Sequence, residues 1–192
     1  MKKILLIGGG GHCKSVIDVI EQEGKFQIAG IIDRPELLGN KTLQYKIIGN
    51  DQDLTSLAKQ YTYAIVTVGQ VSSPKLRINL FNRIKEAGFS IPCIVSPRAY
   101  VSSYASIAEG TVIMHDAVIN ASASVGENCI INTKAIIEHD VVIKDHCHVS
   151  TGAIVNGAAM IGEGSFVGSS ATTKEAISVK ANSFIKAGSV AK

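Results

Sequence analysis

The chain has 192 residues, of which 46% are apolar and 18% charged, and its formal net charge is +3. This composition predicts a folded protein of one large or two small domains and excludes general disorder. The small net charge gives no basis for binding nucleic acid or an anionic membrane. No apolar run is long enough to span a membrane, and residues 1–7 are too short for a signal peptide. We therefore expect a cytoplasmic protein with neither a nucleic-acid partner nor a membrane partner.

Residues 1–95 alternate strand and helix patterns, which is typical of a small α/β domain. In chain order the expected elements are a strand at 3–7, a helix at 12–20, a strand at 28–32, a helix at 53–60, a strand at 63–68 and a helix at 74–87. The last helix has a predicted buried face at Leu76, Leu80, Phe81 and Ile84. Strand, glycine turn, helix and strand in succession predict a parallel sheet with right-handed crossovers, which is a Rossmann-like βαβ arrangement.

Residues 96–192 follow a repeat of six. Every sixth residue from Val101 to Ile185 is Ile or Val, with Thr173 as the exception, and the residue two positions earlier is usually small. This period fits neither a helix nor an ordinary amphipathic strand. It predicts a chain that turns after every short strand, with three hexads to a coil and residues 18 apart stacked on one another. We expect five such coils, with Cys129 and Cys147 in one interior column.

The first expected strand runs into the glycine turn Gly8–Gly11, which is followed by His12 at the start of a helix. Bare amide groups at a helix start can bind an anion, and glycine lets a phosphate approach the backbone. Gly8 and Gly10 match the first two positions of G-x-G-x-x-G, whereas Cys13 replaces the third glycine. Asp33 ends the second strand, where a ribose-binding acid is expected. This pattern favours a nucleotide site over a simple tight turn, and the missing third glycine disfavours NAD.

Together, the glycine turn and the hexapeptide repeat resemble the sialic-acid O-acetyltransferase and nucleotide-4-amino-sugar N-acetyltransferase family of bacterial surface-glycan pathways. The resemblance implies a domain at 1–95 that binds a nucleotide-sugar and a left-handed parallel β-helix at 96–192 that carries acetyl-CoA-dependent N-acetyltransferase activity. It also implies a homotrimer. The nucleotide-sugar positions that it assigns are Gly10, Gly11, His12, Asp33, Arg34 and Gly69.

The segment Glu138-His139-Asp140 carries the expected chemistry. By resemblance, His139 is the general base and Asp140 raises its basicity. Imidazole titrates near neutrality, and a neighbouring carboxylate favours the imidazolium. A solvent-facing histidine at a coil corner is the alternative interpretation.

The resemblance also aligns three further positions with acetyl-CoA binding. His148 would contact acetyl-CoA near the thioester carbonyl, and Ser169 and Ala187 would be further contacts. For His148, the alternative is a residue that merely stacks in line with Ile130 and Phe166.

Four histidines in the repeat, at 115, 139, 146 and 148, raise the question of a metal site. His139 and His148 are expected on different sides of the coil, so they cannot share an ion within one chain, and we expect no metal. Two other functions stay open from the sequence. Sialic-acid O-acetylation would use the same base, and a non-catalytic β-helix could bind a nucleotide-sugar without turnover.

Overall fold

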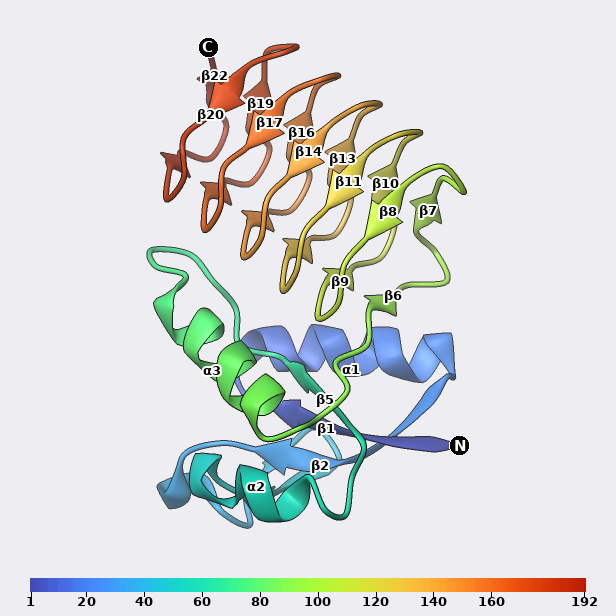
Figure 1. The fold of residues 1–192 in the computed structure, drawn as a ribbon, viewed down its shortest axis with the longest axis vertical. Coiled ribbons are helices and arrows are strands. Elements are labelled where there is room, and N and C mark those ends of the chain that lie inside the picture. Colours follow the sequence, from blue (N-terminus) through green and yellow to red (C-terminus); the bar gives the residue numbers. More distant parts are fainter. The chain divides into compact units, whose positions relative to one another are not determined.

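The computed structural model describes residues 1–192, which form two compact units (Figure 1). The N-terminal unit comprises Met1–Gly69 and Lys75–Pro92, and the β-helix unit comprises Gln70–Pro74 and Cys93–Lys192. None of the helices is long and apolar enough to span a membrane.

A five-stranded sheet in the order β3-β4-β2-β1-β5 forms the centre of the N-terminal unit. The strands are β1 (Lys2–Ile7), β2 (Phe26–Ile32), β3 (Lys41–Thr42), β4 (Tyr45–Gly49) and β5 (Tyr63–Val66). Strand β1 pairs in parallel with β2 and β5, and β2 pairs in parallel with β4, whereas β3 is antiparallel to β4. The parallel βαβ arrangement predicted from the sequence is confirmed, and the short strands β3 and β4 are an addition to it. All four parallel strands therefore end at the same edge of the sheet.

Three helices and two 3₁₀ turns connect these strands: α1 (Gly11–Glu23), α2 (Leu54–Leu57), α3 (Lys75–Glu86), η1 (Pro35–Leu37) and η2 (Asp51–Asp53). Helix α1 is capped at its C-terminus by Gly24, which has a left-handed φ of 68°. There its N–H donates to the carbonyl of Ile20 at 3.0 Å. Glycine suits this position because it has no Cβ to clash in the left-handed region.

The buried face of α3 differs from the prediction at one turn. Leu76 is 60% exposed, whereas Arg77 is 1% exposed. Strand β5 ends with backbone carbonyls that lack ladder partners, and the Arg77 Nη1 group donates to the carbonyls of Val66 at 2.9 Å and Val68 at 2.8 Å. A buried backbone acceptor without a donor is costly, so this requirement turns Arg77 inward and Leu76 outward.

The β-helix unit is a left-handed parallel β-helix whose two-residue strands form three sheets. One sheet has the order β22-β19-β16-β13-β10-β7, the second β20-β17-β14-β11-β8 and the third β21-β18-β15-β12-β9-β6. The strands are β6 (Ile94–Val95), β7 (Tyr100–Val101), β8 (Ser106–Ile107), β9 (Val112–Ile113), β10 (Val118–Ile119), β11 (Ser124–Val125), β12 (Ile130–Ile131), β13 (Ile136–Ile137), β14 (Val142–Ile143), β15 (His148–Val149), β16 (Ile154–Val155), β17 (Met160–Ile161), β18 (Phe166–Val167), β19 (Thr172–Thr173), β20 (Ser178–Val179), β21 (Phe184–Ile185) and β22 (Val190–Ala191). Strands β7–β21 are those of the predicted hexads, and the structure adds β6 before them and β22 after them.

Residues 18 apart are paired along all three sheets, as predicted. Ile137, for example, pairs with Ile119 on one side and Val155 on the other, and all three side chains are buried. The small residues before each strand also point inward, and both Cys129 and Cys147 are 0% exposed. The branched and small side chains thus fill one narrow core along the stack of coils.

Candidate functional site

His139 lies at the corner that follows strand β13. Its neighbour Asp140 has a φ of 61° in the left-handed region, as does a residue at each corresponding corner of the coil. The His139 carbonyl accepts from Ala158 N–H at 3.0 Å, and the Asp140 N–H donates to Ala121 at 3.1 Å. The corner is therefore fixed to the coil before it and to the coil after it, although both side chains are exposed.

The imidazole of His139 is paired with the carboxylate of Asp140. The distance from Nδ1 to Asp140 Oδ2 is 2.8 Å, and the two side chains are 65% and 60% exposed. An ionised carboxylate can only accept, so Nδ1 carries the proton and Nε2 is the basic nitrogen. This hydrogen bond raises the pKa of His139 above its ordinary 6.5, and the charges of Asp140, Glu138 and Glu175 add to the increase.

Gly157 occupies the position one coil beyond His139, and its lack of a side chain makes room for the imidazole. A Cβ at this glycine would lie 2.9 Å from both Cε1 and Nε2 of the ring. The ring therefore rests over the backbone of Gly157. Sequence reasoning missed this residue, although its position 18 residues after His139 places it in the same column.

His148 lies on β15 and is only 6% exposed. Its Nδ1 group donates to the carbonyl of Gln70, and its Nε2 lies 3.0 Å from the Asn132 amide nitrogen. The Asn132 side-chain oxygen already accepts from Thr133 N–H at 2.8 Å, so the Asn132 amide is the donor to His148. His148 thus donates from Nδ1 and accepts at Nε2, so both ring nitrogens are engaged within the chain.

The other two expected acetyl-CoA positions are exposed at corners of successive coils. The Ser169 carbonyl accepts from Gly188 N–H at 2.9 Å, which places Ala187 and Ser169 on adjacent coils. The Ser169 hydroxyl is 3.0 Å from that of Ser150. His139 and His148 are not brought together within one chain, because β13 and β15 belong to different sheets.

In the N-terminal unit, Asp33 holds the glycine turn. Its Oδ2 accepts from Gly9 N–H at 2.5 Å, and its Oδ1 accepts from the backbone N–H of Arg34 at 2.7 Å. Gly10 is the N-cap of α1, where no side chain caps the helix, and Gly11 and His12 form the first turn. A helix N-terminus of this kind, without a capping side chain, can bind an anion.

Two further observations concern residues close to this turn. A Cβ at Gly69 would lie 3.4 Å from the Cβ of His12, so these two expected site residues are neighbours. Cys13, at the place of the third glycine, is 0% exposed. Burial raises the pKa of its thiol to about 11, so it stays protonated as a small packing residue.

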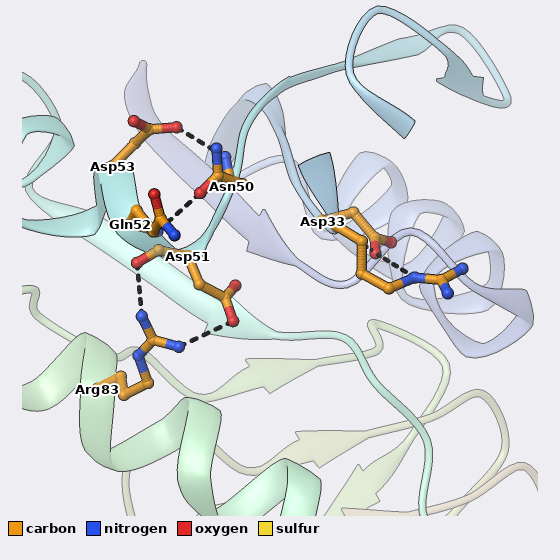
Figure 2. Close-up of polar contacts among 7 residues, drawn as sticks. Asp33, Asn50, Asp51, Gln52, Asp53 and Arg83 are labelled. Carbon is orange, nitrogen blue, oxygen red and sulfur yellow. Dashed lines mark hydrogen bonds and ion pairs between the residues drawn. The ribbon is translucent and has the colours of Figure 1, made fainter. Parts of the chain in front are cut away.

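Two cavities lie along the edge where the parallel strands end. One, of about 170 Å³, is lined by Gly8, Asp33, Arg34 and Asp51 together with apolar side chains. The other, of about 300 Å³, shares Asp33, Arg34 and Asp51 and also contacts Arg83. Figure 2 shows Asp51 paired with Arg83 at this edge. The structure thus brings the expected residues Asp33 and Arg34 together with Asp51 and Arg83, which sequence reasoning missed.

No group of three or more His, Cys, Asp or Glu side chains in the chain could hold a metal ion.

Residues 3–84 match the PglD N-terminal domain family. No curated protein matches the chain significantly. Among solved structures, PerB from Caulobacter crescentus in complex with CoA and GDP-perosamine is 29% identical, covers 100% of this chain and 89% of its own, and has a TM-score of 0.93.

Two other structures are similar over nearly the whole chain. The acetyltransferase domain of PglB from Neisseria gonorrhoeae FA1090, in complex with acetyl coenzyme A, is 29% identical over 97% of this chain and 89% of its own, with a TM-score of 0.89. WeeI from Acinetobacter baumannii AYE is 19% identical over 96% of each chain, with a TM-score of 0.66, and shares the fold. The PglD-type domain at residues 3–84 and the similarity of the whole chain to these acetyltransferase structures are consistent with the nucleotide 4-amino-sugar N-acetyltransferase family.

Proposed function

We propose that the protein is an acetyl-CoA-dependent N-acetyltransferase that acts on the 4-amino group of a nucleotide-linked sugar in bacterial glycan biosynthesis. The observation that carries this proposal is the exposed pair of His139 and Asp140, 2.8 Å apart on a β-helix corner. The similar structures support it, since one is a perosamine N-acetyltransferase solved with CoA and GDP-perosamine and another is an acetyltransferase domain solved with acetyl coenzyme A. We also propose that the reaction takes place in the cytoplasm.

In the proposed reaction, Nε2 of His139 takes a proton from the sugar amine as the nitrogen attacks the thioester carbonyl of acetyl-CoA. Asp140 stabilises the imidazolium that forms, because its carboxylate accepts from Nδ1. The tetrahedral intermediate then collapses, the carbon–sulfur bond breaks, and the CoA thiolate leaves and is protonated. The products are an N-acetylated nucleotide-sugar and free CoA, and no covalent enzyme intermediate forms.

The nucleotide part of the acceptor would bind in the N-terminal unit. The start of α1 at Gly10, Gly11 and His12 suits the diphosphate, because a helix N-terminus attracts anions, and the guanidinium of Arg34 is a further positive group. Asp33 lies after β2, where a carboxylate can accept from ribose hydroxyls. Gly69 would line the same site beside His12.

We further propose that the protein is a homotrimer. The outward positions of the β7–β22 sheet form a mostly apolar column in which Val118, Ile136 and Ile154 are half-buried and Tyr100 and Val190 are 60% and 57% exposed. A flat apolar face of this kind is suited to association. Light scattering at micromolar concentration should give three times the chain mass, and a monomer would contradict the proposal.

Such an assembly would supply what one chain lacks. His139 of one chain could lie beside His148 of the next, with acetyl-CoA between them and with Ser169 and Ala187 along its path. A variant with Ile136→Lys should dissociate the trimer and lose activity while each chain stays folded.

The reaction itself is tested by incubating the protein with acetyl-CoA and a panel of nucleotide-linked 4-amino sugars. Free thiol should appear only when an amino sugar is present, and the sugar product should gain one acetyl group on nitrogen. Acetylation of sialic acid on oxygen instead would favour the O-acetyltransferase alternative. Absence of thiol release with every acceptor would favour the non-catalytic alternative.

A further inference from the structure

The order of the strands places the parts of a bound nucleotide along one edge of the sheet. Gly8 follows β1, Asp33 follows β2, and Asn50 and Asp51 follow β4, which lies next to β2. In sheets of this type the diphosphate sits at the turn after β1, and the ribose sits at the acid after β2. A base attached to that ribose then points beyond β2, toward Asn50 and Asp51. This inference rests on the proposed function, which supplies the nucleotide.

The cavities at this edge have the room that a base requires. The cavity of about 300 Å³ is lined by Asp33, Arg34, Asn50, Asp51 and Arg83, among others. The smaller cavity reaches Gly8 and shares Asp33, Arg34 and Asp51 with the larger one, so the two cavities are adjacent, one at the glycine turn and the other at the end of β4.

Asp51 is held in a fixed orientation by Arg83. The Nη1 group of Arg83 donates to Asp51 Oδ2 at 3.0 Å, and Nη2 donates to the Asp51 backbone carbonyl at 2.8 Å (Figure 2). The two-point contact leaves Asp51 Oδ1 without a hydrogen bond inside the chain. The Asp51 side chain is 37% exposed, so this oxygen can meet a ligand.

The Asn50 side chain is also held in place, but it presents a donor to a ligand where Asp51 presents an acceptor. Its Oδ1 accepts from Gln52 N–H at 2.9 Å, and its backbone N–H donates to Asp53 at 2.8 Å. The carbonyl end of the Asn50 side chain is therefore used in capping η2. The Nδ2 group is the part that can donate to a ligand.

We propose that Asn50 and Asp51 read the base of the nucleotide-sugar and select guanine. Guanine presents an acceptor at O6 beside two adjacent donors, N1–H and the N2 amino group. An amide donor next to a carboxylate acceptor complements that edge. Uracil has one donor between two acceptors, cytosine has two acceptors and one donor, and adenine has one donor beside an acceptor. Each of these three bases offers a carboxylate at Asp51 only one donor, whereas guanine offers it two adjacent ones.

Isothermal titration with free nucleotides tests the base preference directly. GDP should bind most tightly, IDP should bind more weakly because it lacks the 2-amino group, and UDP and CDP should bind about 10- to 100-fold more weakly than GDP. Equal or tighter binding of UDP or CDP would overturn the guanine assignment and leave the proposed function standing. Failure of all four nucleotides to bind would contradict the nucleotide-sugar substrate itself and the inference with it.

The variant Asp51→Asn distinguishes recognition of the base from binding of the rest of the nucleotide. An amide can donate to the oxygen that xanthine carries at position 2, so this variant should prefer XDP to GDP, whereas the wild-type protein should prefer GDP. Asp18→Asn is the matched control, because Asp18 lies on the exposed face of α1, where it accepts from Gln22, and this variant should keep the wild-type order. An Asp51→Asn protein that is folded, binds nucleotide and still prefers GDP over XDP would refute the role of Asp51.

Discussion

Replacement of Gly157 by alanine should reduce catalysis and leave the fold intact. The added Cβ would lie 2.9 Å from Cε1 and Nε2 of His139, whereas carbon atoms in contact are about 3.5–4.0 Å apart. The imidazole must therefore retreat by roughly 0.5–1 Å, and Nε2 is the atom that would take the proton. A misplacement of about 1 Å can reduce a rate about 10²-fold, so we expect a loss in kcat of roughly 10- to 100-fold.

The stability of this variant should change little, because Gly157 does not have the positive φ that disfavours alanine. Its kcat would be measured from the release of CoA thiol, and its Tm from thermal unfolding. The control is a double-mutant cycle with His139→Ala. If Gly157 acts only by positioning the imidazole of His139, Gly157→Ala should cause no further loss of kcat in the His139→Ala background. A folded Gly157→Ala protein with kcat within twofold of wild type would refute this reasoning, and so would an equal further loss in the His139→Ala background.

Two further predictions concern the partner of the catalytic base and the β-helix core. Asp140→Asn removes the main cause of the raised His139 pKa, so the rising limb of the pH–rate profile should move to lower pH, toward 6.5. The plateau rate should also fall, because the base is weaker. An unchanged limb would show that the rising limb does not report the titration of His139. Ile137→Ala should lower the free energy of unfolding by about 2–5 kcal/mol, because Ile137 is 0% exposed in the β-helix core. Val179→Ala, near the last coil, should lower it less, because Val179 is only partly buried. Similar losses for the two variants in urea unfolding would contradict this account of the core.

The β-helix could be predicted from the sequence because its contacts repeat at a fixed separation. Once every sixth residue is branched, each coil closes after 18 residues, and one register follows for the whole unit. The stacked positions of Cys129 and Cys147 are confirmed for that reason. The corner that carries His139 is part of the same repeat, so its outward position could be read from Ile137 two residues earlier.

The remaining features depend on contacts that no local pattern encodes. Arg77 points inward because the carbonyls at the end of β5 need a donor, and the alternation of apolar residues along α3 does not reveal that need. The burial of His148 depends on Gln70, which lies far from it in the sequence. Asp51 and Arg83 are 32 residues apart in the sequence, and no sequence motif links them. The candidate base-reading position could therefore be found only from the structure.

The most direct test of the proposed catalysis compares wild type with His139→Ala in the thiol-release assay across pH, with a nucleotide-linked 4-amino sugar as acceptor. Since Asp140 raises the pKa of His139, the wild-type rate should rise through a pKa above 6.5. His139→Ala removes an exposed side chain and leaves the core untouched, so the protein should stay folded while its rate at neutral pH falls about 10²- to 10⁴-fold. Its residual rate should follow deprotonation of the substrate ammonium instead. A folded His139→Ala protein whose rate stays within a few-fold of wild type would contradict the assignment of His139 as the base.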